Sequence, residues 1–273
     1  MDYMQLIRKS LEYAWKFKFL WLFGFFAVLQ GGGGGGGGGG RGNIKFDHWH
    51  IEPALLVFII FAALILIVIL LLLAVWSEGA LIHGIHKKES GQKTNFSDCS
   101  KAGLNKFASI LGIKLFAIVA VIASLIVMAI FLVPAFIASV IAGIALAIVF
   151  LPVFLILIFL VVSVEGWAMR YVIVKENNCM DAISNGWILF RSNVSKTIGV
   201  AFSSFLTKLL FGIMIFILLG IMALPAILLG IATLGLALIP LIALGLIILV
   251  LTTAYFGTFG SSVWTLGFIQ ITK

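Results

Sequence analysis

Lys208 is the residue whose type and position most strongly suggest chemistry, because it interrupts a long apolar run. It lies about ten residues into that run and follows Ser203 and Thr207. An ionisable side chain at membrane depth is costly, so it indicates a functional site with a partner. Glu165 and Glu78 are the carboxylates expected on the same membrane side. A long lysine can instead extend to the membrane surface, so a polar site and a structural role both remain open.

The other reactive residue types form no recognisable site. His48 and His50, and His83 and His86, have spacings that could bring two ligands to a metal, but no cysteines or carboxylates complete the pattern. The sequence contains no H-E-x-x-H and no G-x-S-x-G motif. We therefore predict no catalytic residue, no cofactor and no metal, and we expect the chain not to be an enzyme.

The composition is that of an integral membrane protein. Apolar residues make up 63% of the chain and charged residues 10%, against about 25% charged in a soluble domain. No water-soluble fold of this length can bury so much apolar surface, so residues 1–273 are expected to form a single membrane domain. The net charge of +8 is better explained by lysines and arginines beside membrane spans than by nucleic-acid binding.

The chain is organised as three similar units, residues 1–89, 90–176 and 177–273. Each unit has a short amphipathic stretch, two long apolar runs and a polar exit. Several residues recur in the same order: Asp98 and Gly103 as Asp181 and Gly186, Glu78-Gly79 as Glu165-Gly166, and Trp167 as Trp264. We predict an all-α protein with six transmembrane helices as three tandem hairpin repeats, each preceded by a cytoplasmic amphipathic interfacial helix.

Glycines and prolines set the expected boundaries. Residues 31–40 are consecutive glycines, which cannot cross hydrocarbon as irregular backbone, so residues 31–52 are predicted to form a Gly-rich external loop. Pro134 is expected to end the third span. Whether the short apolar segments 135–151 and 226–239 are re-entrant or extend the spans is left open.

The first interfacial helix is expected over residues 1–18. Its apolar residues share one face at helical spacing and are expected to point into the membrane: Met4, Ile7, Leu11, Ala14 and Trp15. Of the 18 lysines and arginines, only Arg41 and Lys45 lie on the side of the hairpin tips. Both termini and both cysteines, Cys99 and Cys179, are therefore predicted to be cytoplasmic, without a disulfide.

Two segments carry a resemblance to known proteins. Residues 15–25 (WKFKFLWLFGF) precede the Gly-rich loop, and residues 174–193 (VKENNCMDAISNGWILFRSN) precede a span. In these segments the chain resembles uncharacterised prokaryotic multipass membrane proteins, including the membrane domain attached to some glycerophosphodiester phosphodiesterases. The catalytic soluble domain of those enzymes has no counterpart here, so the resemblance implies a membrane module and carries over no catalytic residue.

These observations favour a non-enzymatic accessory or lipid-interacting module of a prokaryotic cell membrane. Its expected partners are membrane lipids, with anionic headgroups opposite the basic helices, and an unidentified protein partner is compatible with an accessory role. The alternative is a small-solute or lipid transporter with a site near Lys208, because repeats and proline-interrupted segments are features of transporters. A lipid-modifying enzyme is the third hypothesis.

Overall fold

The structure, a computed structural model, describes residues 2–30, 53–232 and 238–272. Within these ranges the secondary structure is entirely helical. The described helices are α1 (Tyr3–Lys16), α2 (Leu20–Gln30), α3 (Pro53–Glu89), α4 (Phe96–Asn105), α5 (Phe107–Ala138), α6 (Val140–Val174), α7 (Cys179–Ser192), α8 (Val194–Ala232) and α9 (Leu238–Thr272).

Five of the described helices, α3, α5, α6, α8 and α9, are long and apolar enough to cross a membrane. The shortest of them, α5, has 32 residues, whereas a hydrocarbon core of about 30 Å needs only about 20. The prediction of an all-helical, multispan membrane protein is confirmed at the level of five candidate spans. The apolar run 19–29, expected from the sequence as the first span, coincides with α2, which has 11 residues. The predicted loop 31–52 after it lies outside the described residues.

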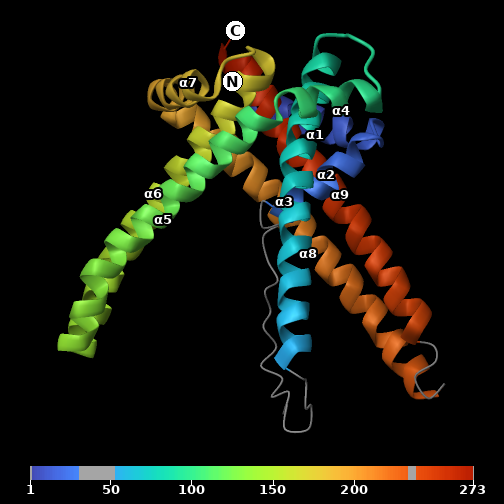
Figure 1. The fold of residues 1–273 in the computed structure, drawn as a ribbon. Coiled ribbons are helices and arrows are strands. Elements are labelled where there is room, and N and C mark those ends of the chain that lie inside the picture. The colour runs from blue at the N-terminus through green and yellow to red at the C-terminus, as the bar shows by residue number, and fades with distance from the viewer. Residues whose placement is uncertain (1, 31–52, 233–237, 273) are drawn as a thin grey trace.

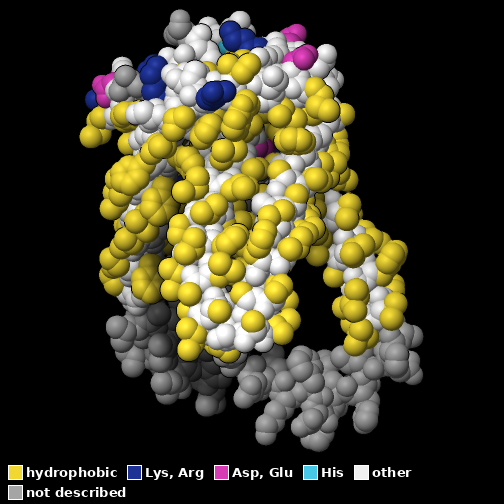
Figure 2. All heavy atoms as spheres, turned by 90° about the vertical axis from the view of Figure 1, so that its left-hand side faces the viewer, with side chains coloured by type: hydrophobic (Ala, Val, Ile, Leu, Met, Phe, Trp, Pro, Cys, Tyr) yellow, Lys and Arg dark blue, Asp and Glu magenta, His cyan; other side chains and the backbone are white. Residues whose placement is uncertain are grey.

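The long helices diverge from one end of the molecule. Both termini lie at this end, and the α5–α6 and α8–α9 hairpins point away from it in different directions, with α3 between them (Figure 1). Charged side chains gather at the same end, and apolar side chains cover the face below it (Figure 2). We call this end the charged end, and the opposite end the tip end.

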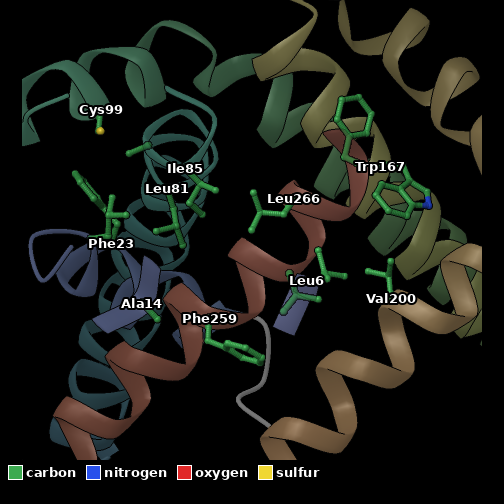
Figure 3. Close-up of a cluster of buried hydrophobic side chains, with 14 of the residues drawn as sticks. Leu6, Ala14, Phe23, Leu81, Ile85, Cys99, Trp167, Val200, Phe259 and Leu266 are labelled. Carbon is green, nitrogen blue, oxygen red and sulfur yellow. The ribbon is translucent and has the colours of Figure 1, made fainter. Parts of the chain in front are cut away.

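The core lies at the charged end, where α3, α6 and α9 meet. Leu81 of α3, Trp167 of α6 and Leu266 of α9 are at most 2% exposed there (Figure 3). Trp167 also contacts Trp264, with ring centroids 4.8 Å apart, and donates a hydrogen bond to Thr197 of α8 at 3.3 Å. Polar ends and apolar bodies of the side chains are therefore both used to join the spans.

Each of the short helices α1, α4 and α7 packs on one long helix. α4 packs on α3, α7 on α6, and α1 on α9. α1 begins at the cap residue Asp2, whose carboxylate accepts hydrogen bonds from the amides of Met4 and Gln5. Its protein-facing side carries Leu6 and Ala14, both fully buried.

The predicted common face of α1 is therefore split. Met4 and Trp15 are 75% and 67% exposed, whereas Ala14 of the same predicted face is buried. The physical reason is that some apolar residues of α1 pack on the protein, whereas others point outward, where the expected neighbour is lipid.

The prediction that Pro134 ends a span is wrong. α5 continues through Pro134 to Ala138, and Pro152 lies inside α6. The chain turns at Ser139, whose extended backbone (φ −163°, ψ 133°) interrupts the helices. Unsatisfied backbone groups are more costly in hydrocarbon than a proline kink, so the helices continue to the turn. Segment 135–151 thus extends both spans.

The second short apolar segment, residues 226–239, behaves in the same way where it is described. α8 runs past Pro225 to Ala232, and α9 begins at Leu238. Residues 233–237 lie outside the described residues.

Glycines allow the closest helix contacts at the charged end. A Cβ atom on Gly103 of α4 would lie 2.5 Å from the Trp76 carbonyl oxygen and 3.0 Å from the Ala80 nitrogen, both in α3. A Cβ atom on Gly186 of α7 would lie 3.0 Å from the Val164 oxygen and the Ala168 nitrogen of α6. These neighbours are backbone atoms, which cannot move aside as a side chain can.

We predict that Gly103→Ala lowers the free energy of unfolding by about 2 kcal/mol, because overpacking outweighs the better helix propensity of alanine. Gly186→Ala should have the same sign and a smaller effect. Denaturation of the purified protein in detergent measures both.

The matched control is Gly212→Ala in α8, where a Cβ atom would meet nothing within 4 Å. It should leave stability unchanged or raise it by up to about 1 kcal/mol. Equal effects of Gly103→Ala and Gly212→Ala would contradict the assigned contact.

Candidate functional site: a charge cluster beside an apolar cavity

Lys114 of α5 is held between two carboxylates. Its Nζ lies 2.8 Å from Glu78 Oε2 of α3 and 3.3 Å from Glu165 Oε1 of α6. The lysine side chain is 10% exposed, and the two glutamate side chains are 18% and 19% exposed. These three residues, which we call the Lys114 cluster, connect three membrane-crossing helices by ion pairs.

The helices bring the cluster together through small and branched apolar residues. Gly79, next to Glu78, lets α5 approach α3, because a Cβ atom there would lie 2.6 Å from Ile110 Cδ1. Ile110 and Ile113 are buried beside Lys114. Lys114 lies 25 residues before the turn at Ser139, about 37 Å along the helix. The cluster therefore lies toward the charged end, farther from the tip end than the thickness of a hydrocarbon core of about 30 Å.

Besides Lys114 of α5, there is a second buried cation, Arg170 of α6. It is 3% exposed, donates from Nη1 to the Gly166 carbonyl oxygen at 2.6 Å, and lies 5.8 Å from the centre of the Trp264 ring. A desolvated cation above tryptophan gains about 2 kcal/mol. Its Nε–H has no acceptor within the described part of the chain. Arg170 makes no ion pair among the described residues, so Lys114 is the cation in contact with Glu78 and Glu165.

An apolar cavity of about 300 Å³ adjoins the cluster. It lies between α5 and α6 below α7, and Glu165 is the one residue of the Lys114 cluster in its wall. The lining residues are Ile113, Phe116, Ala117, Ala120, Leu160, Val161, Val164, Glu165, Ala168, Ile183 and Trp187. Its size is at the lower end of the range for small-molecule sites, about 300–1,000 Å³.

The residues predicted around Lys208 do not converge in the same way. The hydroxyls of Ser203 and Thr207 donate to carbonyl oxygens of their own helix, those of Gly199 at 2.7 Å and Ser203 at 2.9 Å. Lys208 is exposed on the protein surface, and its amine lies against Gly260 of α9.

The expected partner of Lys208, Glu165, is paired with Lys114 instead. The reason is that α5 and α6 form one hairpin and lie side by side (Figure 1), whereas α8 packs mainly on α9. The sequence carries a signal for this site in the recurring glutamate–glycine pair of the exits, Glu78-Gly79 and Glu165-Gly166, but it gives no direct sign that Lys114 is their partner.

Other candidate ligands stay apart. Within the described ranges no three histidine, cysteine, aspartate or glutamate side chains are grouped to hold a metal, and His48 and His50 lie outside those ranges. Cys99 and Cys179 are free thiols. Burial raises the pKa of the Cys99 thiol, despite a contact with Thr94 at 3.3 Å, and burial also raises the pKa of Cys179. Both thiols are thus mainly protonated near neutral pH.

Comparisons with known proteins add no relative. No family model, no curated protein and no solved structure matches the chain.

We predict that Lys114→Met lowers the free energy of unfolding by about 3 kcal/mol, because it leaves two buried carboxylates without their partner. Lys208→Met provides the matched control, since it removes a lysine from another span without breaking a described ion pair, and it should cost less than about 1 kcal/mol. Unfolding in sodium dodecyl sulfate or by heat measures both.

The triple variant Lys114→Met, Glu78→Gln, Glu165→Gln should recover most of the lost stability, because it removes the unpaired charges as well. If the triple variant is no more stable than Lys114→Met, the loss does not come from the ion pairs.

Proposed function

We propose that the protein is a non-enzymatic, lipid-interacting module of a prokaryotic cell membrane. The observation that carries the proposal is that the spans diverge and leave their apolar surfaces uncovered. In α3 the side chains of Val57, Phe58 and Phe61 are 64%, 70% and 61% exposed, as are most of their neighbours. Such a surface is stable only when lipid chains or another apolar surface cover it.

The charged end supplies the complementary polar contact. Lysines and arginines gather there (Figure 2), and the short helices α1, α4 and α7 lie at the same end. Basic residues next to a membrane surface attract anionic lipid by about 1 kcal/mol each. This arrangement supports cytoplasmic termini and anionic lipids as partners.

We infer a threefold repeat with six spans as the finer architecture. Its support is that each short helix packs on the last long helix of the preceding unit: α4 on α3, α7 on α6 and, closing the circle, α1 on α9. The recurring Gly103 and Gly186 also make equivalent close contacts with α3 and α6. In this interpretation α2 belongs to the remaining span, and α1, α4 and α7 are the interfacial helices.

A solute path is less well supported than lipid contact. Leu81, Trp167 and Leu266 fill the junction of α3, α6 and α9, and the hydroxyls near Lys208 bond within their own helix. A transporter mechanism would have to open this packed junction.

The proposal predicts selective stabilisation by lipid. Adding phosphatidylglycerol to the detergent-purified protein should raise the melting temperature by about 5 °C at saturation. Phosphatidylcholine with the same acyl chains should raise it less, because its headgroup carries no net charge. The proposal fails if neither lipid raises the melting temperature, or if the purified protein alone turns over a substrate.

Membrane orientation can be tested with a pair of exposed positions. Gln92 follows α3 at the charged end, and Ser139 forms the α5–α6 turn at the tip end; both are exposed. In intact cells an impermeant maleimide should label Ser139→Cys and leave Gln92→Cys unlabelled until the membrane is permeabilised. The native Cys99 is fully buried, so these variants are the sharper probe. The reverse pattern would invert the orientation.

A further inference from the structure

Two hollows of different chemistry lie beside helix α7. Below it lies the apolar cavity of about 300 Å³, in which Ile183 and Trp187 form the α7 side of the wall. A second, shallow depression of about 430 Å³ is lined by Trp187, Ile188, Arg191 and Ser192 of α7 itself. Trp187 lines both hollows, so an apolar volume and a cationic, hydroxyl-bearing surface adjoin at one side chain.

The apolar cavity has the chemistry of a hydrocarbon site. Its wall consists of aliphatic and aromatic residues except for Glu165. The Glu165 carboxylate has a counterion within the protein, the Lys114 ammonium at 3.3 Å, which it shares with Glu78. A chain without polar groups can therefore lie against this wall without stranding a charge.

The depression has the chemistry of an anion site at a membrane surface. Arg191 is exposed and makes no ion pair among the described residues. A guanidinium fits a phosphate by two parallel hydrogen bonds. The neighbouring Ser192 hydroxyl donates to the Leu189 carbonyl oxygen at 3.2 Å, so Arg191 is the donor of this depression. Trp187, 43% exposed, has the amphipathic ring that favours the boundary between headgroups and acyl chains.

We propose that α7 forms a site for one phosphate-bearing membrane lipid, with an acyl chain in the apolar cavity and the phosphate on Arg191. This inference rests on the proposed lipid-interacting function and gives it a specific site and ligand class. The lipid is an anionic glycerophospholipid, because its negative headgroup complements Arg191 and its chain matches the cavity.

The test counts phosphatidylglycerol molecules retained by the purified protein in native mass spectrometry, with phosphatidylcholine of the same chains as competitor. Arg191→Gln should weaken retention about fivefold, the equivalent of one surface cation. Ala120→Phe should also reduce retention, because the ring fills the cavity. Arg191 is exposed, so its variant tests the site even if the Ala120 variant folds poorly.

Two matched controls separate the site from general effects. Ala123→Phe places the same ring one turn along α5 at an exposed position, and Lys93→Gln removes a cation from an exposed loop; both should retain lipid as the wild type does. If the wild type shows no preference for phosphatidylglycerol, the proposed function fails. If the wild type prefers it but Arg191→Gln and Ala120→Phe match their controls, the α7 site alone is overturned.

Discussion

The packed junction of α3, α6 and α9 is the constraint on which the rest of the structure depends. Between apolar helices in a bilayer there is little hydrophobic driving force, because lipid chains are as apolar as leucine. Close packing therefore has to be concentrated where side chains interlock, as Leu81, Trp167 and Leu266 do at the charged end. Beyond the junction α3, the α5–α6 hairpin and the α8–α9 hairpin diverge from one another (Figure 1). The apolar surfaces proposed to meet lipid follow from this uneven distribution of contacts.

The short helices complete the junction by polar as well as apolar contacts. The Tyr13 hydroxyl of α1 donates to Glu89 Oε2 at 2.7 Å, and Lys9 lies 3.1 Å from Glu89 Oε1. Burial and this hydrogen bond raise the pKa of the Tyr13 phenol above its ordinary value of 10.0. The phenol therefore remains a donor throughout the physiological pH range, and α1 stays tied to the end of α3. An exposed ion pair alone would give less than about 1 kcal/mol.

The sequence predicts the helices well because long apolar runs leave the backbone little choice in a membrane. It predicts their ends less well: Pro134 is a helix breaker in water, yet α5 continues past it to Ala138. It also favours Lys208 as the buried lysine, although Lys114 is the one with partners. Depth along a helix can be counted from the sequence, but which helices become neighbours depends on contacts distant in the chain. For the same reason the sequence does not predict the lipid site proposed at Trp187 and Arg191, since that site depends on a cavity made by three helices.

The Lys114 cluster and the apolar cavity depend on each other physically. Glu165 lies in the cavity wall, and an uncompensated carboxylate there would draw in water and exclude a hydrocarbon chain. Lys114 supplies a counterion to Glu165 from the α5 side and shares it with Glu78 of α3. Replacing a buried ion set by apolar residues can leave stability unchanged, so stability alone does not explain the cluster. The position of the cluster explains it better, because the ion pairs tie α3, α5 and α6 together toward the charged end and give Glu165 a counterion beside the apolar cavity.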